Sequence, residues 1–456
     1  MIFELTDPKV HASMIRVNST HDPKRRSWVE AANVSGADFP IQNLPHGVFR
    51  HRGRERGGIA IGDKILDLAE CVAAGLFDNA EVAAAAEAAS QSELNTYMAM
   101  GPAASSALRE AVSNILSENG PGSDRLRALR HSLLLAQEEV ELKLPCAIRN
   151  YTDFLTSAYH TERHGRLKGL ADPLPPAFKS LPVAYHGRAS SIRPSGYPVR
   201  RPSGQWKGKD RLAEFGAVRC LDFELEVGGF IGCGNELGQP IPMREARDHL
   251  FGYCLLNDWS AKDVQWWEQV LGPFLGKSFI TTVSPWVVTA EALAPFRGPY
   301  PGRQPEDPDI LPHLRPTVEM TMDFLELTLT AEIRSARMRA AGAAAGRVIT
   351  RTSTRHLYWS FEQMVTHHAS NGCNLLPGDL IGSGTVSGPE PEEMACMTEM
   401  TSAGTKPIDL GGGERRNWLE DGDEVVLRAR AEREGFVSIG FGPCVGQIEP
   451  AVSWPT

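Results

Sequence analysis

Residues 220–230 read CLDFELEVGGF, and apolar side chains alternate there with acidic ones. Because successive side chains of a β-strand point to opposite faces, this period of two predicts a strand with three carboxylates on one face. Carboxylates at i and i+2 lie about 7 Å apart at the backbone, so their oxygens can converge on one cation. The acidic face is therefore either solvated or bound to a cation, and the segment alone leaves both interpretations open. The acids are Asp222, Glu224 and Glu226.

The length, composition and net charge of the chain favour two domains and a small-molecule ligand. A chain of 456 residues exceeds the usual span of one hydrophobic core. The hydrophobic share of 42% and the charged share of 23% are typical of soluble globular proteins. The net charge of −9 argues against a nucleic-acid or acidic-membrane partner, because either would require a basic face.

The cysteines indicate a reducing compartment. All eight are scattered without a C-x-x-C pair, which favours free thiols over a zinc framework or a disulfide scaffold. The opening segment MIFELTDPKVHASMIRV has no long apolar region, and no run of 18 apolar residues occurs in the chain. We therefore expect a cytoplasmic protein that has no membrane partner.

Patterning along the chain predicts an N-terminal extension over 1–36 and domains over 37–143 and 144–456. Short apolar segments between 39 and 68 predict a few strands of a small β-rich unit. An Ala/Glu tract at 79–89 and leucines at helical spacing over 123–142 predict two helices, the second connecting the domains. Short strands and Pro/Gly turns dominate from 144 onward. The Ala/Gly-rich segment 335–349 is interpreted as a surface loop or an inserted helix.

The segment NYTDFLTSAYHTERHG (150–165) contains two candidate site residues, Asp153 and His160. They are seven positions apart and share one face if the segment is helical. His160 and His164 have the spacing of a zinc-binding helix, but Thr161 stands where the zinc protease motif requires Glu. A histidine held in the packing is an equally open interpretation.

The segment LLNDWSAKDVQWWEQ (255–269) predicts a buried strand that ends at Asp258 and a helix that follows it. Ser260 and Asp263 have the spacing of a capping box at the start of that helix. The helix would place Lys262, Gln265 and Gln269 on one face. A surface ion pair between Lys262 and Asp258 is the alternative interpretation.

Two glycine clusters, GCGNELG (232–238) and GSGTVSG (382–388), are each one residue too long for a dinucleotide fingerprint. The chain also lacks a P-loop and a G-x-S-x-G nucleophile motif. Nucleotide binding and a serine nucleophile are therefore disfavoured.

Several long segments, in order along the chain, resemble the fumarylacetoacetate hydrolase family. They include DFPIQNLPHGVF (38–49), LPVAYHGRASSI (181–192), LDFELE (221–226), NDWSAKDVQ (257–265), LGPFLGKSF (271–279), PGDLIGSGTVSG (377–388) and GTKPIDLG (404–411). The resemblance implies a mostly β (α+β) fold, with a small SH3-like N-terminal β-barrel domain, a larger mixed β-roll catalytic domain and a homodimer. It also implies metal-dependent hydrolysis of a carbon–carbon bond in a β-diketo acid. The leading substrate is 4-fumarylacetoacetate, split into fumarate and acetoacetate in the last step of tyrosine catabolism.

Carried over position by position, the resemblance assigns three groups of site residues. The expected ligands of Mg²⁺ or Ca²⁺ are Asp153, Glu224, Glu226 and Asp258, with Lys277 and Thr281 in a secondary role. The expected catalytic residues are the dyad His160 and Glu399 and the oxyanion-stabilising Lys262, Gln265 and Lys277. The expected substrate contacts are Tyr185, Thr385, Leu155, Gln269 and Arg166.

The sequence departs from the family pattern in the substrate pocket. Lys262 stands in place of an arginine, and Leu155 and Gln269 stand in place of two tyrosines. A further family arginine has no clear counterpart, with Arg166 and Lys168 nearby. These changes leave open another diketo acid, as in acylpyruvate hydrolases or β-keto acid decarboxylases, or a non-catalytic metabolite-binding role. Retention of His160 and Glu399 favours hydrolysis.

Overall fold

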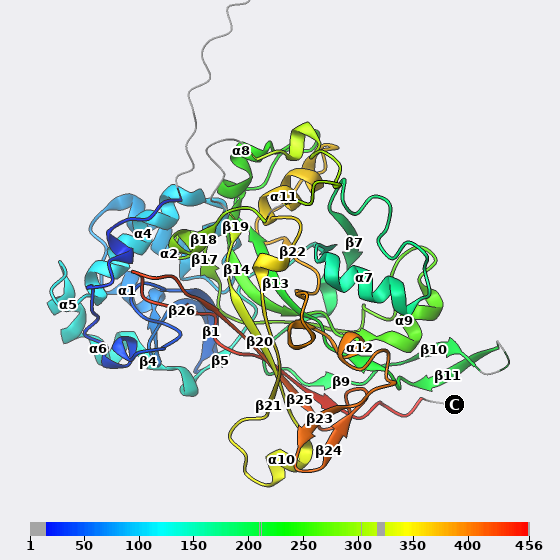
Figure 1. Cartoon of the computed structure of the whole chain (residues 1–456). Coiled ribbons are helices and arrows are strands. Elements are labelled where there is room, and N and C mark those ends of the chain that lie inside the picture. Colours follow the sequence, from blue (N-terminus) through cyan, green and yellow to red (C-terminus); the bar gives the residue numbers. More distant parts are fainter. Residues whose placement is uncertain (1–14, 209, 211, 302, 317–323, 455–456) are drawn as a thin grey trace, which may run out of the picture.

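The fold is mixed α+β and contains three main sheets (Figure 1). The computed structural model describes residues 15–208, 210, 212–301, 303–316 and 324–454. Within these ranges no helix has the length and apolar character needed to cross a membrane.

The N-terminal unit is organised around a five-stranded antiparallel sheet. Its central meander consists of β1 (His46–His51), β2 (Arg54–Ile61) and β3 (Lys64–Asp67), which confirms the short strands predicted there. The helices of the unit, coloured blue to cyan in Figure 1, are α1 (Leu68–Ala73), α2 (Ala80–Ala89), α3 (Asn95–Ala99) and α4 (Gly101–Leu116). Helix α2 confirms the prediction for 79–89, and the Asn79 side chain caps it by accepting from two backbone N–H groups.

The prediction of one helix over 123–142 is wrong. The segment forms two short helices, α5 (Ser123–Ala128) and α6 (Arg130–Leu133), followed by strands β4 (Leu134–Ala136) and β5 (Glu141–Leu142). Strand β4 pairs with β3 and strand β5 with β1, so they form the two edges of the sheet. Edge pairing therefore outweighs the helical spacing of the leucines, as tertiary contacts often do for intrinsic propensity.

Residues 15–36 pack against the N-terminal unit. They include short 3₁₀ helices at Ser19–His21 and Glu30–Asn33. The Ser27 hydroxyl donates to the Leu116 carbonyl at 2.9 Å, and Val29 and Ala32 join the hydrophobic core of the unit. The remainder of the predicted extension, 1–14, lies outside the described residues.

The second sheet positions the candidate site. It runs in the order β7-β6-β22-β13-β14-β16-β8, with β17 pairing to β14. The strands are β6 (Tyr151–Leu155), β7 (Val183–Gly187), β8 (Ile192–Pro194), β13 (Leu225–Ile231), β14 (Leu250–Asn257), β16 (Thr281–Val283), β17 (Val288–Thr289) and β22 (Leu380–Gly382). Apolar residues on one face, such as Leu225 and Leu255, join the main core. Phe230 and Leu256 on the other face join the core of the N-terminal unit, so this sheet connects the two halves.

The third sheet packs against the second and has the order β21-β20-β25-β27-β9. Its strands are β9 (Val199–Arg200), β20 (Thr328–Arg334), β21 (Arg347–Ser353), β25 (Glu424–Ala431) and β27 (Cys444–Glu449). Between β20 and β21 lies helix α10 (Ala336–Ala340), so the Ala/Gly-rich segment carries an inserted helix. The β10–β11 hairpin (Ser203–Lys207 and Ala213–Ala217) projects beside helix α9 (Lys262–Glu268).

Candidate active site

The three acids of the opening segment are all buried, which rules out a solvated acidic face. Asp222 and Glu226 are 0% exposed and Glu224 is 6% exposed. The predicted strand is interrupted: Asp222 ends β12 (Leu221–Asp222), and Glu226 lies near the start of β13. The three carboxylates have different partners, and therefore different roles.

The Glu226 carboxylate belongs to a cluster of three buried acids. Asp153 on β6, Glu226 on β13 and Asp258 just after β14 bring carboxylate oxygens within 4.8 Å of one another. Among the described residues, no donor reaches either oxygen of Glu226 or Oδ1 of Asp258. Burial and the neighbouring carboxylates raise the pKa of Asp153 and of Glu226 well above the usual range. Such an arrangement fits a hard divalent cation, because this kind of ion prefers oxygen ligands and would offset the repulsion between the three carboxylates.

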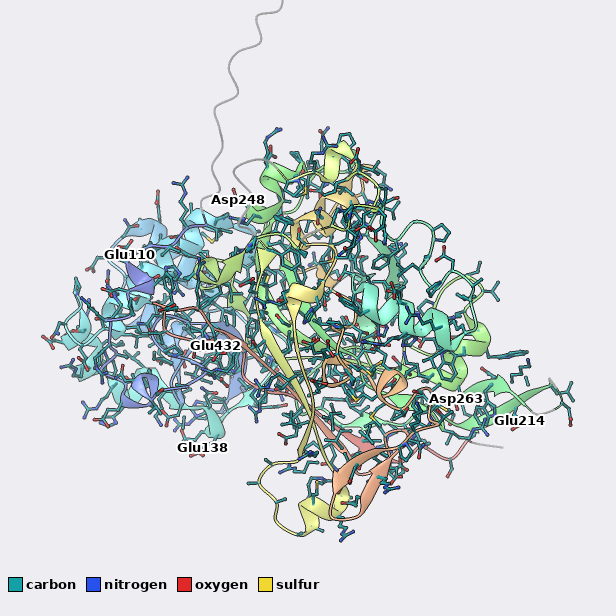
Figure 2. The ribbon with its side chains drawn as sticks, viewed as in Figure 1. Glu110, Glu138, Glu214, Asp248, Asp263 and Glu432 are labelled. Atoms are coloured by element: carbon teal, nitrogen blue, oxygen red, sulfur yellow. The ribbon has the colours of Figure 1, made fainter. Side chains whose placement is uncertain are left out.

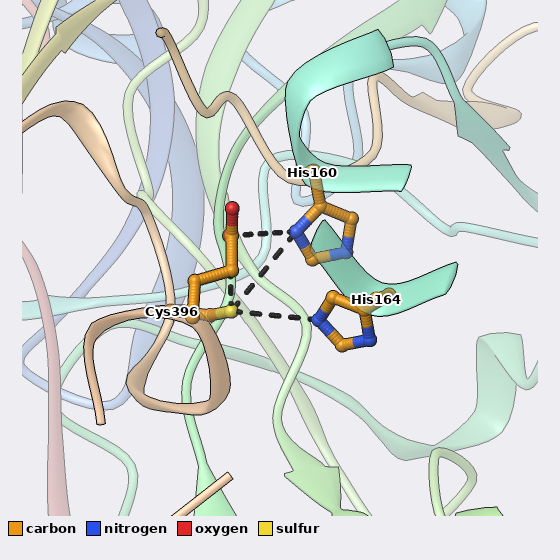
Figure 3. Close-up of side chains that lie close together, drawn as sticks. His160, His164 and Cys396 are labelled. Atoms are coloured by element: carbon orange, nitrogen blue, oxygen red, sulfur yellow. Dashed lines mark hydrogen bonds and ion pairs between the residues drawn. The ribbon is translucent and has the colours of Figure 1, made fainter. Parts of the chain in front are cut away.

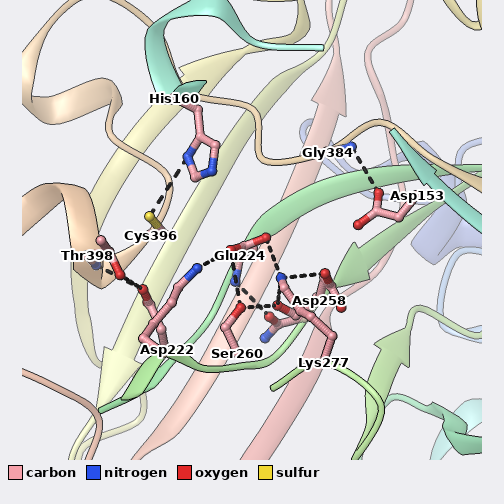
Figure 4. Close-up of polar contacts among 12 residues, drawn as sticks. Asp153, His160, Asp222, Glu224, Asp258, Ser260, Lys277, Gly384, Cys396 and Thr398 are labelled. Carbon is pink, nitrogen blue, oxygen red and sulfur yellow. Dashed lines mark hydrogen bonds and ion pairs between the residues drawn. The ribbon is translucent and has the colours of Figure 1, made fainter. Parts of the chain in front are cut away.

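The Glu224 carboxylate lies between two buried lysines (Figure 4). Its Oε1 accepts from Lys262 Nζ at 2.5 Å, and its Oε2 accepts from Lys277 Nζ at 2.7 Å. Burial lowers the pKa of each lysine, but the neighbouring carboxylates outweigh it, so both pKa values lie above the ordinary value. Two fixed positive charges therefore lie beside the carboxylate cluster.

Lys277 also connects Glu224 to the cluster. Its Nζ donates to Asp258 Oδ2 at 2.5 Å, and the Tyr185 hydroxyl donates to the same oxygen at 2.7 Å. Asp258 thus keeps one oxygen bound to these donors and the other free of donors among the described residues. The free oxygen is the one available to a cation.

His160 and Glu399 form the expected pair. His160 lies in the first turn of α7 (Ala158–Leu167), which Ser157 caps, and Glu399 lies on α12 (Met397–Met400). His160 Nδ1 and Glu399 Oε2 are 2.8 Å apart. Burial alone would raise the pKa of Glu399, but the adjacent His160 holds it well below the usual range. An ionised carboxylate at Nδ1 leaves Nε2 as the nitrogen that can accept a proton.

Asp222, the remaining acid of the segment, binds the start of the helix that carries Glu399. Its oxygens accept from the backbone N–H groups of Met397 and Thr398 and from the Thr398 hydroxyl. These bonds fix the start of the short helix that carries Glu399.

A cavity of about 780 Å³ is lined by His160 of the dyad, by Lys262 and Lys277, and by Asp153 and Glu226 of the carboxylate cluster. Its lining includes the predicted residues Leu155, Tyr185, Gln265, Gln269 and Thr385, together with Lys168. Thr281 instead lines a second cavity of about 770 Å³, which shares Tyr185 and Lys277 with the first and is also lined by Asp258. The Arg166 side chain is 69% exposed and bonds to Glu162 at 3.0 Å, so it does not line either cavity.

The structure decides three local questions that the sequence raised. The segment 150–165 is not one helix, because Asp153 lies on a strand and His160 on the helix that follows. No capping box starts α9: the Ser260 hydroxyl donates to Glu224, and Asp263 (Figure 2) accepts from the Arg219 backbone N–H. The alternative interpretation, a surface ion pair between Lys262 and Asp258, does not hold, because Lys262 is 1% exposed and donates to Glu224.

Four further residues contact the dyad and were not assigned to it from the sequence. Arg163 donates to Glu399 Oε1 at 3.1 Å, and Ser387 donates to Oε2 at 2.7 Å. Cys396 Sγ lies 3.2 Å from Glu399 Oε2, and the His164 ring lies against the His160 ring with centroids 4.2 Å apart and planes tilted by 39°. Only His164 had a sequence signal, its four-residue spacing from His160.

Comparisons with known proteins agree with this arrangement. The family model described as "Fumarylacetoacetate (FAA) hydrolase C-terminal" matches residues 143–449, and the one described as "Fumarylacetoacetase N-terminal" matches residues 42–145. The chain is 45% identical to the fumarylacetoacetase of Homo sapiens over 434 residues, which are 93% of this chain and 99% of that protein. It is 42% identical to the fumarylacetoacetase of Oryza sativa over 436 residues, or 94% of this chain and 98% of that protein.

A solved structure supports the fold. The fumarylacetoacetate hydrolase of Exiguobacterium antarcticum superposes with a TM-score of 0.50 at 18% identity, covering 89% of this chain and 99% of that one. At this identity the likeness concerns the fold alone. The family models and the curated relatives together span both halves of the chain, and the chain belongs to the fumarylacetoacetate hydrolase family.

Proposed function

We propose that this chain hydrolyses 4-fumarylacetoacetate to fumarate and acetoacetate. The observation that carries the proposal is one cavity lined by His160, by two buried lysines, and by Asp153 and Glu226 of the carboxylate cluster. Glu399 is bonded to His160 behind this lining. A water-activating base, positive charge for an oxyanion and ligands for a hard cation are the groups that hydrolysis of a diketone requires.

His160 is the proposed general base. Glu399 binds Nδ1, so Nε2 takes a proton from water as the water oxygen attacks a ketone carbonyl carbon. The resulting tetrahedral oxyanion is stabilised by the ammonium groups of Lys262 and Lys277 and by the Gln265 amide, which lines the cavity. Collapse of this intermediate re-forms the carbonyl of fumarate and breaks the carbon–carbon bond. The electron pair goes to the acetoacetate carbon, which then takes up the proton held by His160.

Asp153, Glu226 and Asp258 are proposed to hold Mg²⁺ or Ca²⁺. Glu224, whose oxygens accept from Lys262 and Lys277, is proposed as the fourth carboxylate. A bound ion would supply positive charge that orients the two ketone oxygens and stabilises negative charge developing on them. Lys277, which donates to both Glu224 and Asp258, is proposed to orient these carboxylates, and Thr281 lies on the neighbouring cavity wall.

Substrate recognition is proposed to involve Tyr185, Thr385, Leu155 and Gln269, which line the cavity. Leu155 supplies an apolar wall and Gln269 an amide, so this part of the cavity has no fixed charge to pair with the fumaryl carboxylate. Lys262 and Lys277 also line the cavity but bind Glu224. Lys168 is therefore proposed to bind the fumaryl carboxylate, the role first expected of Arg166.

The proposal extends to architecture and assembly. We propose an SH3-like barrel domain over 37–143 after the extension 1–36, and a β-roll catalytic domain over 144–456. The antiparallel pairing of five strands in one small sheet supports a β-rich N-terminal domain. A homodimer and a cytoplasmic location complete the proposal, and mass measurement of the native protein tests the dimer.

The direct test offers fumarylacetoacetate, an acylpyruvate and a β-keto acid to the purified protein in Mg²⁺ or Ca²⁺. Loss of the diketone absorbance is followed, and the products are identified. We expect equal amounts of fumarate and acetoacetate, formed faster than the products of the other two acids. Turnover of an acylpyruvate with fumarylacetoacetate left intact would overturn the substrate assignment, and the Leu155 and Gln269 positions would be its structural cause.

A further inference from the structure

A second group of potential metal ligands consists of the catalytic pair and two neighbouring residues (Figure 3). His160, His164, Cys396 and Glu399 each offer one ligand atom, and these four atoms all lie within 4.8 Å of one another. Cys396 Sγ lies 4.0 Å from His160 Nδ1, 3.9 Å from His164 Nε2 and 3.2 Å from Glu399 Oε2. Neither His164 nor Cys396 has a part in the hydrolysis proposed above.

The distances suit a tetrahedral transition-metal ion. With Zn–S near 2.3 Å and Zn–N near 2.0 Å, a sulfur and a nitrogen ligand on one tetrahedral centre lie about 3.5 Å apart. The observed Sγ–N separations exceed this by roughly 0.4–0.5 Å, a movement that small side-chain rotations can supply. The two histidines lie one turn apart on α7, so the helix already presents them to the same point.

The charges of the four groups also suit a divalent ion. Two neutral imidazoles, one thiolate and one carboxylate would balance a charge of +2. The ion and its four ligands together would therefore be neutral, which avoids the cost of burying a net charge. His164 lines the large cavity, which gives an ion a route to the cluster.

We infer that His160, His164, Cys396 and Glu399 form a binding site for a thiophilic divalent metal such as Zn²⁺, separate from the all-oxygen carboxylate cluster. Thiolate and imidazole ligands select zinc-like ions, whereas carboxylates suit Mg²⁺ and Ca²⁺. On binding, the Cys396 thiol releases its proton to solvent and Sγ bonds to the metal.

Occupancy of this site would block the proposed general base. The metal takes the lone pair of His160 Nδ1, so the one proton of the neutral imidazole resides on Nε2. That nitrogen then cannot accept a proton from water. Glu399 is drawn from the imidazole to the metal at the same time. Zinc is therefore an inhibitor that acts on the dyad, and this consequence, unlike the binding itself, rests on the proposed function.

Binding is tested first, because it requires no turnover. Co²⁺ is titrated into the Mg²⁺-loaded protein, and absorption is recorded for the ligand-field bands of a tetrahedral ion and the charge-transfer band of a cobalt–thiolate bond. We expect the wild-type protein to show both, and Cys396→Ser to lack the charge-transfer band. The serine hydroxyl can still donate to Glu399, so the dyad keeps a donor at that position. His164→Gln should weaken Co²⁺ binding by about tenfold or more, since one of four ligands is lost.

The matched control is Cys233→Ser, which removes a half-buried thiol outside the cluster that donates to the Ala99 carbonyl. It should leave the cobalt spectrum unchanged. A spectrum in Cys396→Ser or His164→Gln that equals that of the wild type would overturn the site. Two variants are used so that a folding defect in one does not decide the result.

Inhibition is tested second, with Zn²⁺ added to enzyme in saturating Mg²⁺ and each variant compared with its own zinc-free rate. We expect the inhibiting Zn²⁺ concentration to rise by about tenfold or more in Cys396→Ser and in His164→Gln. Equal zinc sensitivity in the wild type and both variants would overturn the inhibitory role and place zinc at the carboxylate cluster. If the protein fails to hydrolyse fumarylacetoacetate, the cobalt titration still decides whether the metal site exists.

Discussion

Asp222 accepts two hydrogen bonds from Thr398, one from its backbone N–H at 2.8 Å and one from its hydroxyl at 2.6 Å. Thr398 directly precedes Glu399, so these bonds hold the turn from which Glu399 reaches His160. The first acid of the 220–230 segment therefore positions the dyad, while Glu226 belongs to the cation cluster.

Asp222→Asn should lower kcat by about 10–100-fold with a smaller effect on KM, because a slight displacement of Glu399 misaligns His160. The amide group cannot accept from Met397 and Thr398 together, so we also expect a loss of about 1–3 kcal/mol in the free energy of unfolding. Steady-state kinetics and denaturant titration measure the two effects. Asp263→Asn, on the neighbouring helix α9, is the control. A kcat unchanged in a destabilised Asp222→Asn protein would contradict the positioning role.

Glu226→Gln should have opposite effects on stability with and without metal. In chelator at neutral pH it should raise the free energy of unfolding by about 1–3 kcal/mol. Because the pKa of Glu226 is raised, folding must either protonate this carboxyl group or bury its charge, and the amide avoids that cost. In Mg²⁺ or Ca²⁺ it should weaken ion affinity by about tenfold or more and lower activity, which excess metal partly restores. Thermal unfolding and calorimetric titration measure both. The exposed Glu138→Gln (Figure 2) is the control. Full activity in chelator would contradict the cation site.

His160→Ala should lower kcat by about 10²–10⁴-fold, the usual contribution of a general base, with little change in KM. His160 and Glu399 act as one unit, so His160→Ala combined with Glu399→Gln should be about as slow as His160→Ala alone. Rates of single and double variants are compared under saturating substrate. Additive losses would indicate that the two residues act independently.

The parts of the fold that followed from sequence were those set by local pattern. The alternation over 220–230 predicted the strand, and Asn79 marked the start of α2. The helix predicted over 123–142 failed because β4 and β5 form the sheet edges through pairings distant in sequence. Local periodicity carries no information about such partners.

For the site, the sequence predicted which residue types gather there but not which side chains contact one another. Residue types and spacing suggested that carboxylates converge, but not which one remains without donors and which one binds the lysines. Glu224 and Glu226 are two positions apart, yet only Glu224 faces Lys262 and Lys277. The contact between Cys396 and the dyad depends on the placement of α12 against α7, which no pattern in the chain indicates.

Two buried histidines should make the protein sensitive to acid. Burial, assisted by the Arg109 charge, lowers the pKa of His46 to about 3 and that of His21 to about 4. Below pH 6.5 the unfolded chain therefore binds protons that the folded chain does not. The free energy of unfolding should fall as the pH drops, by up to about 1.4 kcal/mol per pH unit for each histidine.

His46→Gln tests this dependence, because it removes one titrating group between the N-terminal unit and Phe251 of β14. Denaturant titrations at pH 5, 6 and 7.5 should give a shallower loss of stability than in the wild type. The exposed His131→Gln should leave the slope unchanged. Parallel curves for His46→Gln and the wild type would show that His46 does not titrate as its burial predicts.

Lys262→Ala should reduce kcat by about 10²-fold or more with a smaller effect on KM, because the ammonium binds the transition-state oxyanion more strongly than the ground-state ketone. The exposed Lys207→Ala serves as the control. Lys262→Arg restores the group expected from the family, but its planar fork must fit beside Glu224 in a cavity lined by Leu155 and Gln269. We expect Lys262→Arg to match the wild type on fumarylacetoacetate if that acid is the natural substrate, and to be slower if the pocket is adapted to another diketo acid. If Ala and Arg both behave like wild type on every substrate, Lys262 only balances the charge of Glu224 and has no part in stabilising the oxyanion.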